Sequence, residues 1–253
     1  MTLYGIVIFM QNIKLTLAYD GTNYHGFATQ PDVQTVSDTL KKALKELTSS
    51  DVKLISASRT DAGAHAKCQV VNFFTNSNIP LEALPKALNS RLPEDIVVYH
   101  ACKVKDTFHA RFDAKYRKYR YSILNTKYPD VFYRRYAYWV SFNLNLEDML
   151  KACLFLVGEH DFSAYASELK TIKNPVRNIE ELSIDQENGF IHFNIKANAF
   201  LFNMVRTIVG TLINVGRGKL TPVDVKYILD SKDRSKASPV VPPQGLCLME
   251  VGY

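Results

Sequence analysis

The sequence lacks the motifs that mark several large enzyme classes. It has no G-x-x-x-x-G-K-[ST] phosphate-binding loop, no G-x-G-x-x-G dinucleotide-binding segment and no G-x-S-x-G nucleophile turn. Nucleotide hydrolysis, dinucleotide redox chemistry and serine hydrolysis therefore lose support.

Cysteine pairs and long apolar runs are also missing. The four cysteines lie far apart, and none has the C-x-x-C spacing of a zinc or redox site. The apolar stretch 3–10 has about one third of the length that a membrane span needs, and it lacks the basic start and cleavage site of a signal peptide. We therefore expect a cytoplasmic protein with reduced thiols and no membrane contact.

The composition is that of a folded protein with a small excess of positive charge. Of 253 residues, 47% are apolar and 22% are charged, which is ordinary for globular proteins. With 31 Lys and Arg against 25 Asp and Glu, the net charge is +6. This charge suits a polyanionic partner such as nucleic acid, although a lysine-rich proteome would also produce it.

Hydrophobic periodicity predicts one order of elements twice. In the first half, strands are expected at 12–20, 52–57, 68–75 and 96–104, and helices at 35–48 and 80–91. In the second half, strands are expected at 116–124, 176–185, 190–197 and 245–251, and helices at 146–157, 201–215 and 222–230. Asn188-Gly189 is a strong signal for a hairpin turn. The order is that of the βαββαβ ferredoxin-like unit.

We therefore predict an α+β fold of two ferredoxin-like halves, joined edge to edge into one mainly antiparallel sheet with helices on one face. The predicted divisions are an N-terminal extension (residues 1–11), an N-terminal half (12–110) and a C-terminal half (111–253). A ligand would lie in the groove between the halves.

The segment Ser58–Ala66 places one carboxylate beside an arginine and a turn of small residues. Asp61-Ala62-Gly63 favours a turn, because Asp and Gly are poor in strand interiors. A loop between two strands is a common place for a catalytic residue. The alternative is that Asp61 only forms the turn.

The segment from 103 to 127 alternates basic and aromatic residues. Strand periodicity would place on one face Arg111, Asp113, Lys115, Arg117, Tyr119 and Tyr121. The other face of this strand is also cationic. Such a surface can hold phosphates and stack bases. The alternative is a solvated edge strand whose charges prevent aggregation.

Arg206 is the only charged residue in the apolar stretch 201–212. A buried guanidinium needs a partner, since an unpaired buried charge costs several kcal/mol. Asp61 is the partner that we prefer, and another acidic residue is the alternative.

A metal site built from Asp61, His65 and Cys68 is disfavoured. These three residues mix ligand preferences, and a convincing site needs ligand number and spacing together. We expect no metal.

Several segments together resemble the tRNA pseudouridine synthases of the TruA type. The matching segments, in order, are Tyr19–Thr22 with Tyr24 and Gly26, Arg59–Gly63 with His65, Phe108–Phe112 with Arg117, Tyr119 and Tyr121, Gly158–Phe162, Lys196–Phe200 with Met204–Arg206 and Gly210, and Pro243–Leu246. They cover nearly the whole chain in the spacing of the family. The chain departs from the family pattern at Ser58 (usually Gly), at Phe27-Ala28 (usually Trp-Gln) and at Ala64 (commonly Val). From the sequence we expect these departures to affect loop contacts to RNA and not the chemistry.

The resemblance implies the pseudouridine synthase fold, a homodimer and tRNA as substrate, at uridines 38, 39 and 40 of the anticodon arm. It implies that Asp61 is the catalytic aspartate, that Tyr119 stacks on the target uracil and is a candidate base for its carbon 5 proton, and that Arg206 pairs with the aspartate. Arg59 would help to flip the base. The other residues that we expect to contact substrate are Thr60, His65, Arg111, Lys115, Arg117, Phe27 and Leu246.

The residue types suit this reaction. Conversion of uridine to pseudouridine breaks the bond between nitrogen 1 and the sugar and rejoins the ring through carbon 5, so it is an isomerisation that needs no cofactor. An ionised Asp61 can add to carbon 6 of the uracil or trap carbon 1′ of the ribose, and the sequence leaves both routes open. Burial alone would raise the pKa of Asp61, and Arg206 beside it would reverse that shift.

Two other functions compete with this interpretation. One is a noncatalytic RNA-binding module, since ferredoxin-like sheets with exposed aromatic residues often bind RNA. The other is an acid–base hydrolase that uses Asp61 and His65.

Overall fold

The computed structural model describes residues 10–168 and 173–253. Most of the predicted N-terminal extension, residues 1–9, lies outside the described residues. Its last residue, Gln11, already belongs to the first strand.

Within the described residues the chain forms one ten-stranded sheet in the order β4-β1-β3-β10-β5-β9-β8-β7, with β2 paired to β3 and β6 paired to β5. The strands are β1 Gln11–Tyr19, β2 Ile55–Ser56, β3 His65–Thr75, β4 Ile96–Lys103, β5 Tyr116–Leu124, β6 Tyr138–Trp139, β7 Gly158–Asp161, β8 Val176–Glu187, β9 Phe190–Ala197 and β10 Leu246–Gly252. The helices are α1 Val36–Thr48, α2 Leu84–Asn89, α3 Leu146–Leu154, α4 Met204–Gly216 and α5 Pro222–Ser231.

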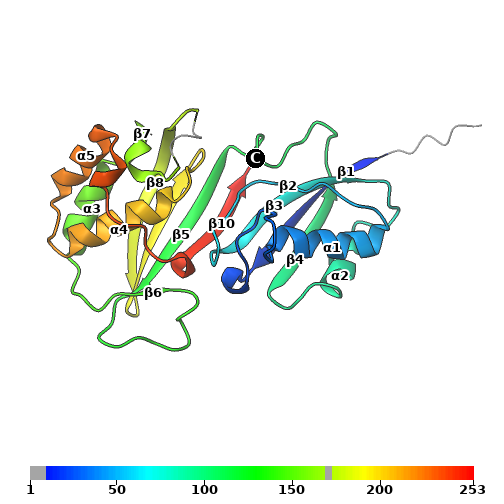
Figure 1. Ribbon diagram of the computed structural model, residues 1–253, viewed down its shortest axis with the longest axis horizontal. Helices are drawn as coiled ribbons and strands as arrows, with labels where there is room; N and C mark the ends of the chain where they lie inside the picture. Colours follow the sequence, from blue (N-terminus) through cyan, green and yellow to red (C-terminus); the bar gives the residue numbers. More distant parts are fainter. Residues whose placement is uncertain (1–9, 169–172) are drawn as a thin grey trace, which may run out of the picture.

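The sheet is built from two halves that meet at β10. Strands β4, β1 and β3 carry α1 and α2, whereas β10, β5, β9, β8 and β7 carry α3, α4 and α5 (Figure 1). Strand β10 pairs in parallel with β3 and antiparallel with β5, with Leu248 opposite both Ala66 and Tyr119. The predicted α+β fold with helices on one face of a mainly antiparallel sheet is confirmed.

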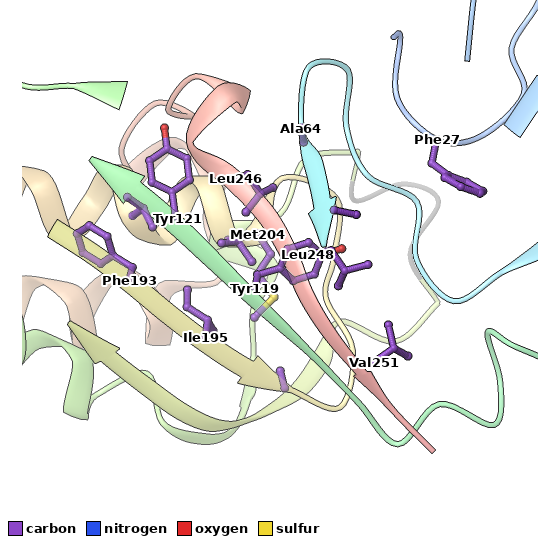
Figure 2. Packing of buried hydrophobic residues seen from close by; sticks show 14 of the residues in the cluster. Phe27, Ala64, Tyr119, Tyr121, Phe193, Ile195, Met204, Leu246, Leu248 and Val251 are labelled. Atoms are coloured by element: carbon purple, nitrogen blue, oxygen red, sulfur yellow. The ribbon is translucent and has the colours of Figure 1, made fainter. Parts of the chain in front are cut away.

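The buried core runs without a break through the joint between the halves. Figure 2 shows Leu246, Leu248 and Val251 along β10, beside Tyr121 of β5. Leu248 and Tyr121 are both 0% exposed. Helix α4 closes this part of the core because it is apolar nearly all round. The predicted hairpin between β8 and β9 is also present, and Asn188 and Gly189 both have positive φ, as such a turn requires.

One expectation about β5 was wrong. The basic and aromatic strand β5 lies in the middle of the sheet, between β10 and β9, so it is not an edge strand. Arg111 lies in a turn before it and Lys115 immediately precedes it, so only Arg117, Tyr119 and Tyr121 share its helix-covered face, and all three are buried. The strand that covers one edge of β5 comes from the far C-terminus, which a local charge pattern does not reveal.

Several element bounds also differ from the prediction. The expected strand 52–57 is reduced to β2, and the helix expected at 80–91 to α2. Helix α4 begins only at Met204, because Asn203 before it has a positive φ of 61°. Strand β6 is too short to show a period-two pattern, and β7 is short and polar.

Leu248→Ala should destabilise the protein by about 2–5 kcal/mol, because a fully buried leucine at the joint would leave a cavity. Leu154→Ala is the matched control, since Leu154 at the end of α3 is 74% exposed, and it should change stability by less than about 0.5 kcal/mol. Urea unfolding measures both. Equal effects would show that β10 does not hold the halves together.

Candidate active site

The loop between β2 and β3 is fixed to its neighbours by backbone contacts. The Thr60 carbonyl accepts from the Phe27 amide at 3.2 Å, and the Gly63 amide donates to the Tyr24 carbonyl at 3.1 Å. Gly26 has φ +88°, and a Cβ there would lie 2.7 Å from the Thr60 carbonyl oxygen. Only glycine at position 26 lets the segment between β1 and α1 lie this close to the loop between β2 and β3.

Buried polar side chains hold the first part of the same loop. Gln69 of β3 is 0% exposed; its Oε1 accepts from the Ser58 amide at 3.2 Å and its Nε2 donates to the Ser58 carbonyl at 2.9 Å. The Thr60 hydroxyl lies 2.7 Å from the Tyr19 hydroxyl. Asp61 therefore extends from a backbone that is anchored immediately before it.

Asp61 forms an ion pair with Arg206 from the other half of the molecule. Arg206 Nη1 donates to Asp61 Oδ2 at 2.7 Å, and each side chain is 14% exposed. The guanidinium is oriented by two further acceptors, the Val241 carbonyl at 2.8 Å from Nε and Asn203 Oδ1 at 3.0 Å from Nη1. A charge-assisted hydrogen bond of this length is among the stronger polar contacts in proteins.

Tyr119 of β5 lies close to this pair. It is 5% exposed, its ring meets Phe200 edge-on at 5.1 Å, and its hydroxyl is 2.5 Å from the Ser58 hydroxyl. Burial raises the pKa of Tyr119 to about 12; the Ser58 hydrogen bond opposes this shift and the Asp61 charge adds to it. The phenol is therefore neutral at pH 7.

Arg117 ties together the segments that surround the site. Its guanidinium donates to the carbonyls of Ala57 at 3.0 Å, Asn198 at 2.9 Å, Ala114 at 3.0 Å and Arg111 at 2.5 Å. Burial lowers the pKa of Arg117, and these carbonyls take the place of water around the charge.

The arrangement offers an oriented carboxylate, a guanidinium that stabilises its charge and an aromatic ring with a neutral hydroxyl. Within residues 10–168 and 173–253, no cluster of three or more His, Cys, Asp or Glu side chains could hold a metal ion. Asp61 is bound to Arg206, and His65 is occupied elsewhere. The site is suited to nucleophilic attack by Asp61 on a substrate that stacks on an aromatic ring.

Comparison with known proteins shows the family to which the chain belongs. The family model described as tRNA pseudouridine synthase matches residues 16–113 and 152–253. The chain is 49% identical to tRNA pseudouridine synthase A of Thermoanaerobacter sp. (strain X514) over 244 residues, which are 96% of this chain and 100% of that protein. It is 46% identical, with the same coverage, to tRNA pseudouridine synthase A 2 of Clostridium perfringens.

The chain belongs to the tRNA pseudouridine synthase family. Its relatives carry the name of an isomerase, and the resemblance found in the sequence is confirmed. Among the described residues, no helix is long and apolar enough to cross a membrane.

Four of the residues that were predicted from the sequence to contact RNA instead make contacts within the protein. Thr60, His65 and Arg117 are buried, with their polar atoms bonded to other parts of the protein, and Phe27 packs against Tyr19 with ring centroids 6.0 Å apart. Figure 2 shows Phe27 well away from Tyr119.

His65 illustrates the reason for this difference. Its Nδ1 accepts from the Gly21 amide at 3.0 Å, and its Nε2 lies 2.7 Å from the Arg135 carbonyl. The imidazole therefore links the start of β3 to a loop of the second half, and its predicted contact with substrate stays a prediction. Sequence alone does not distinguish a buried anchoring histidine from one that binds RNA.

The other predicted contacts lie where RNA could reach them, with one exception. Arg59, Arg111 and Lys115 are exposed. Leu246 is 5% exposed at the start of β10, opposite Tyr121. Their roles remain predictions.

The sequence analysis missed residues that position the site. Gln69 and Phe200 carry no chemistry of their own, and Asn203 is an ordinary polar residue before a helix. The available signals were a glutamine within an apolar strand and the departure from the family pattern at Ser58.

Arg206→Met should lower the free energy of unfolding by about 3–5 kcal/mol, because it leaves the enclosed carboxylate without its partner. Adding Asp61→Asn to Arg206→Met should recover part of this loss. Lys226→Met is the control, since the Lys226–Asp230 pair is exposed, and it should cost less than about 1 kcal/mol. Urea unfolding measures these three variants and Asp61→Asn alone; strictly additive effects of the two site substitutions would refute the ion pair.

Proposed function

We propose that this synthase converts uridine to pseudouridine at positions 38, 39 and 40 of the tRNA anticodon arm, with Asp61 as nucleophile. The observation that carries the proposal is the 2.7 Å contact between Asp61 and Arg206 beside the Tyr119 ring, in a chain whose relatives are named tRNA pseudouridine synthase A. The three positions rest on the resemblance to the TruA type.

The target nucleotide leaves its stack before reaction, which costs a few kcal/mol. Stacking of the uracil on Tyr119 returns about 1–3 kcal/mol of this cost. Arg59, exposed two residues before Asp61, would fill the space that the base leaves. Exposed Arg111 and Lys115 would bind the phosphate backbone without reading the bases.

Asp61 then attacks carbon 6 of the uracil or carbon 1′ of the ribose. In either route the bond between nitrogen 1 and the sugar breaks, the ring turns and carbon 5 bonds to carbon 1′. The bond to Asp61 then breaks, the proton of carbon 5 leaves and nitrogen 1 takes up a proton, so the product is an isomer of the substrate and the carboxylate is regenerated. Arg206 orients the carboxylate for attack through its 2.7 Å hydrogen bond to Asp61 Oδ2. For Tyr119 we propose stacking on the uracil and keep it as a candidate base for the carbon 5 proton; burial raises the pKa of its phenol to about 12.

The noncatalytic alternative explains less of the site. An RNA-binding surface gains nothing from a half-enclosed ion pair whose desolvation is costly. The hydrolase alternative requires His65 as its second catalytic group beside Asp61. It is disfavoured because His65 is buried and bonded to Gly21 and Arg135.

We further propose that the synthase is a cytoplasmic homodimer, as the resemblance implies. The sheet face opposite Tyr119 has a hollow of about 620 Å³ beside Arg120 and Ser122, and the half-exposed rings of Tyr133 and Tyr136 line it. A partly apolar, uncovered face of this kind is typical of an interface between proteins.

Sedimentation equilibrium should give a mass of about 57 kDa, twice the 28.7 kDa of one chain. Tyr136→Asp should shift the mass toward one chain, whereas Tyr227→Asp, on exposed α5 outside the hollow, should leave it unchanged. A monomer at all concentrations would contradict the dimer.

Asp61→Ala should lower turnover by more than about 10⁴-fold, because it removes the nucleophile. The measurement is release of tritium from tRNA that contains [5-³H]uridine, since the reaction expels the hydrogen of carbon 5. The dissociation constant for tRNA should stay within about threefold, because phosphate contacts dominate affinity.

Asp51→Ala is the matched control for this substitution, since the Asp51 side chain is 85% exposed, and it should keep full turnover. A folded Asp61→Ala protein that still releases tritium would exclude Asp61 as nucleophile. One that no longer binds tRNA would give Asp61 a binding role instead.

A further inference from the structure

The hydroxyl of Ser58 is in direct contact with the hydroxyl of Tyr119. The two oxygens are 2.5 Å apart, and Ser58 is the only hydrogen-bond partner that the Tyr119 hydroxyl has among the described residues. Tyr119 is 5% exposed, so water does not readily replace this partner. Loss of the contact would leave a buried phenol hydroxyl unpaired, which is costly.

Ser58 is itself held in place from both sides. The amide group of Gln69 grips its backbone N–H and its carbonyl. The preceding carbonyl, that of Ala57, accepts two bonds from Arg117, at 3.3 Å from Nε and 3.0 Å from Nη2. Gln69 and Arg117 are both buried, so the Ser58 hydroxyl is fixed to the rigid part of the sheet.

We propose that Ser58 is a positioning residue that sets the Tyr119 ring relative to the Asp61 carboxylate. Ser58 and Asp61 are three residues apart on one anchored loop. The hydrogen bond between the Ser58 and Tyr119 hydroxyls therefore fixes the position of the Tyr119 ring relative to the Asp61 carboxylate. Phe200 supports the ring from another side, edge-on at 5.1 Å. The inference rests on the proposed function, in which the target uracil stacks on this ring.

The contact affects the chemical step more than the binding of tRNA. Most affinity for tRNA comes from its phosphates, which are remote from a buried pair of hydroxyls. Attack by Asp61 requires the reacting atoms to be in contact and aligned, and small displacements of the stacked base lower the rate. A substitution at Ser58 should therefore change the rate constant and leave the affinity unchanged.

The test is single-turnover conversion of [5-³H]uridine tRNA at saturating protein, with wild type and Ser58→Ala. The rate constant should fall by about two- to twelvefold, which corresponds to the about 0.5–1.5 kcal/mol of one hydrogen bond. The protein concentration at half-saturation should not change. Ser58→Thr, which keeps the hydroxyl, should react faster than Ser58→Ala.

A double-mutant cycle with Tyr119→Phe separates positioning from a general effect on the fold. Ser58→Ala should have no further effect on the rate of Tyr119→Phe, because the bond is already absent. If Tyr119→Phe is too slow to measure, the same cycle is read from urea unfolding, where the two substitutions should be less than additive.

Three results would overturn the inference: an unchanged rate in Ser58→Ala, an equal loss in Ser58→Ala and Ser58→Thr at wild-type stability, or additive effects of Ser58→Ala and Tyr119→Phe. Failure of the proposed function looks different, because the wild-type protein would then release no tritium at all.

Discussion

The Asp61–Arg206 ion pair is the interaction on which the site depends. A carboxylate that is largely enclosed needs an opposite charge, and here that charge comes from a helix 145 residues away in the chain. The pair therefore forms only when the two halves are joined. Strand β10 makes this joint by pairing with β3 of the first half and β5 of the second, so a C-terminal strand without a charged group in the site determines whether the site exists.

Buried polar groups supply the rigidity around that pair. Gln69, Arg117 and His65 each satisfy backbone groups of segments that meet at the site. Their desolvation is offset only when every bond is made, and such networks then favour one arrangement strongly. A nucleophile that must meet one atom of a flipped base benefits from a loop that has no alternative conformation of similar energy.

The chemistry of the site was easier to predict from the sequence than its supporting contacts. Arg206 could be assigned a partner because a lone charge in an apolar helix is costly wherever the helix lies. Asp61 could be placed on a loop from turn preferences alone, and the fold followed from periodicity and the order of elements. These are local rules, and the structure agrees with them.

Arg117 and His65 could not be interpreted in the same way. Their surroundings include β10, which lies beside β5, and the loop around Arg135, which contacts His65. Both of these segments are distant in the sequence from the residues that they surround. A basic residue that faces solvent and a buried one that binds four backbone carbonyls look alike in a sequence. The same limit applies to Ser58, whose hydroxyl gained significance only when Tyr119 was found beside it.

The most direct test of the account is a map of pseudouridine in tRNA treated with the protein alone. Unmodified tRNA transcripts with uridine in the anticodon arm are incubated without any cofactor, and pseudouridine is then located by carbodiimide-blocked primer extension. The account predicts stops at positions 38 to 40. Tight binding of the tRNA without a stop anywhere in its sequence would contradict it and would point to a protein that binds RNA without modifying it.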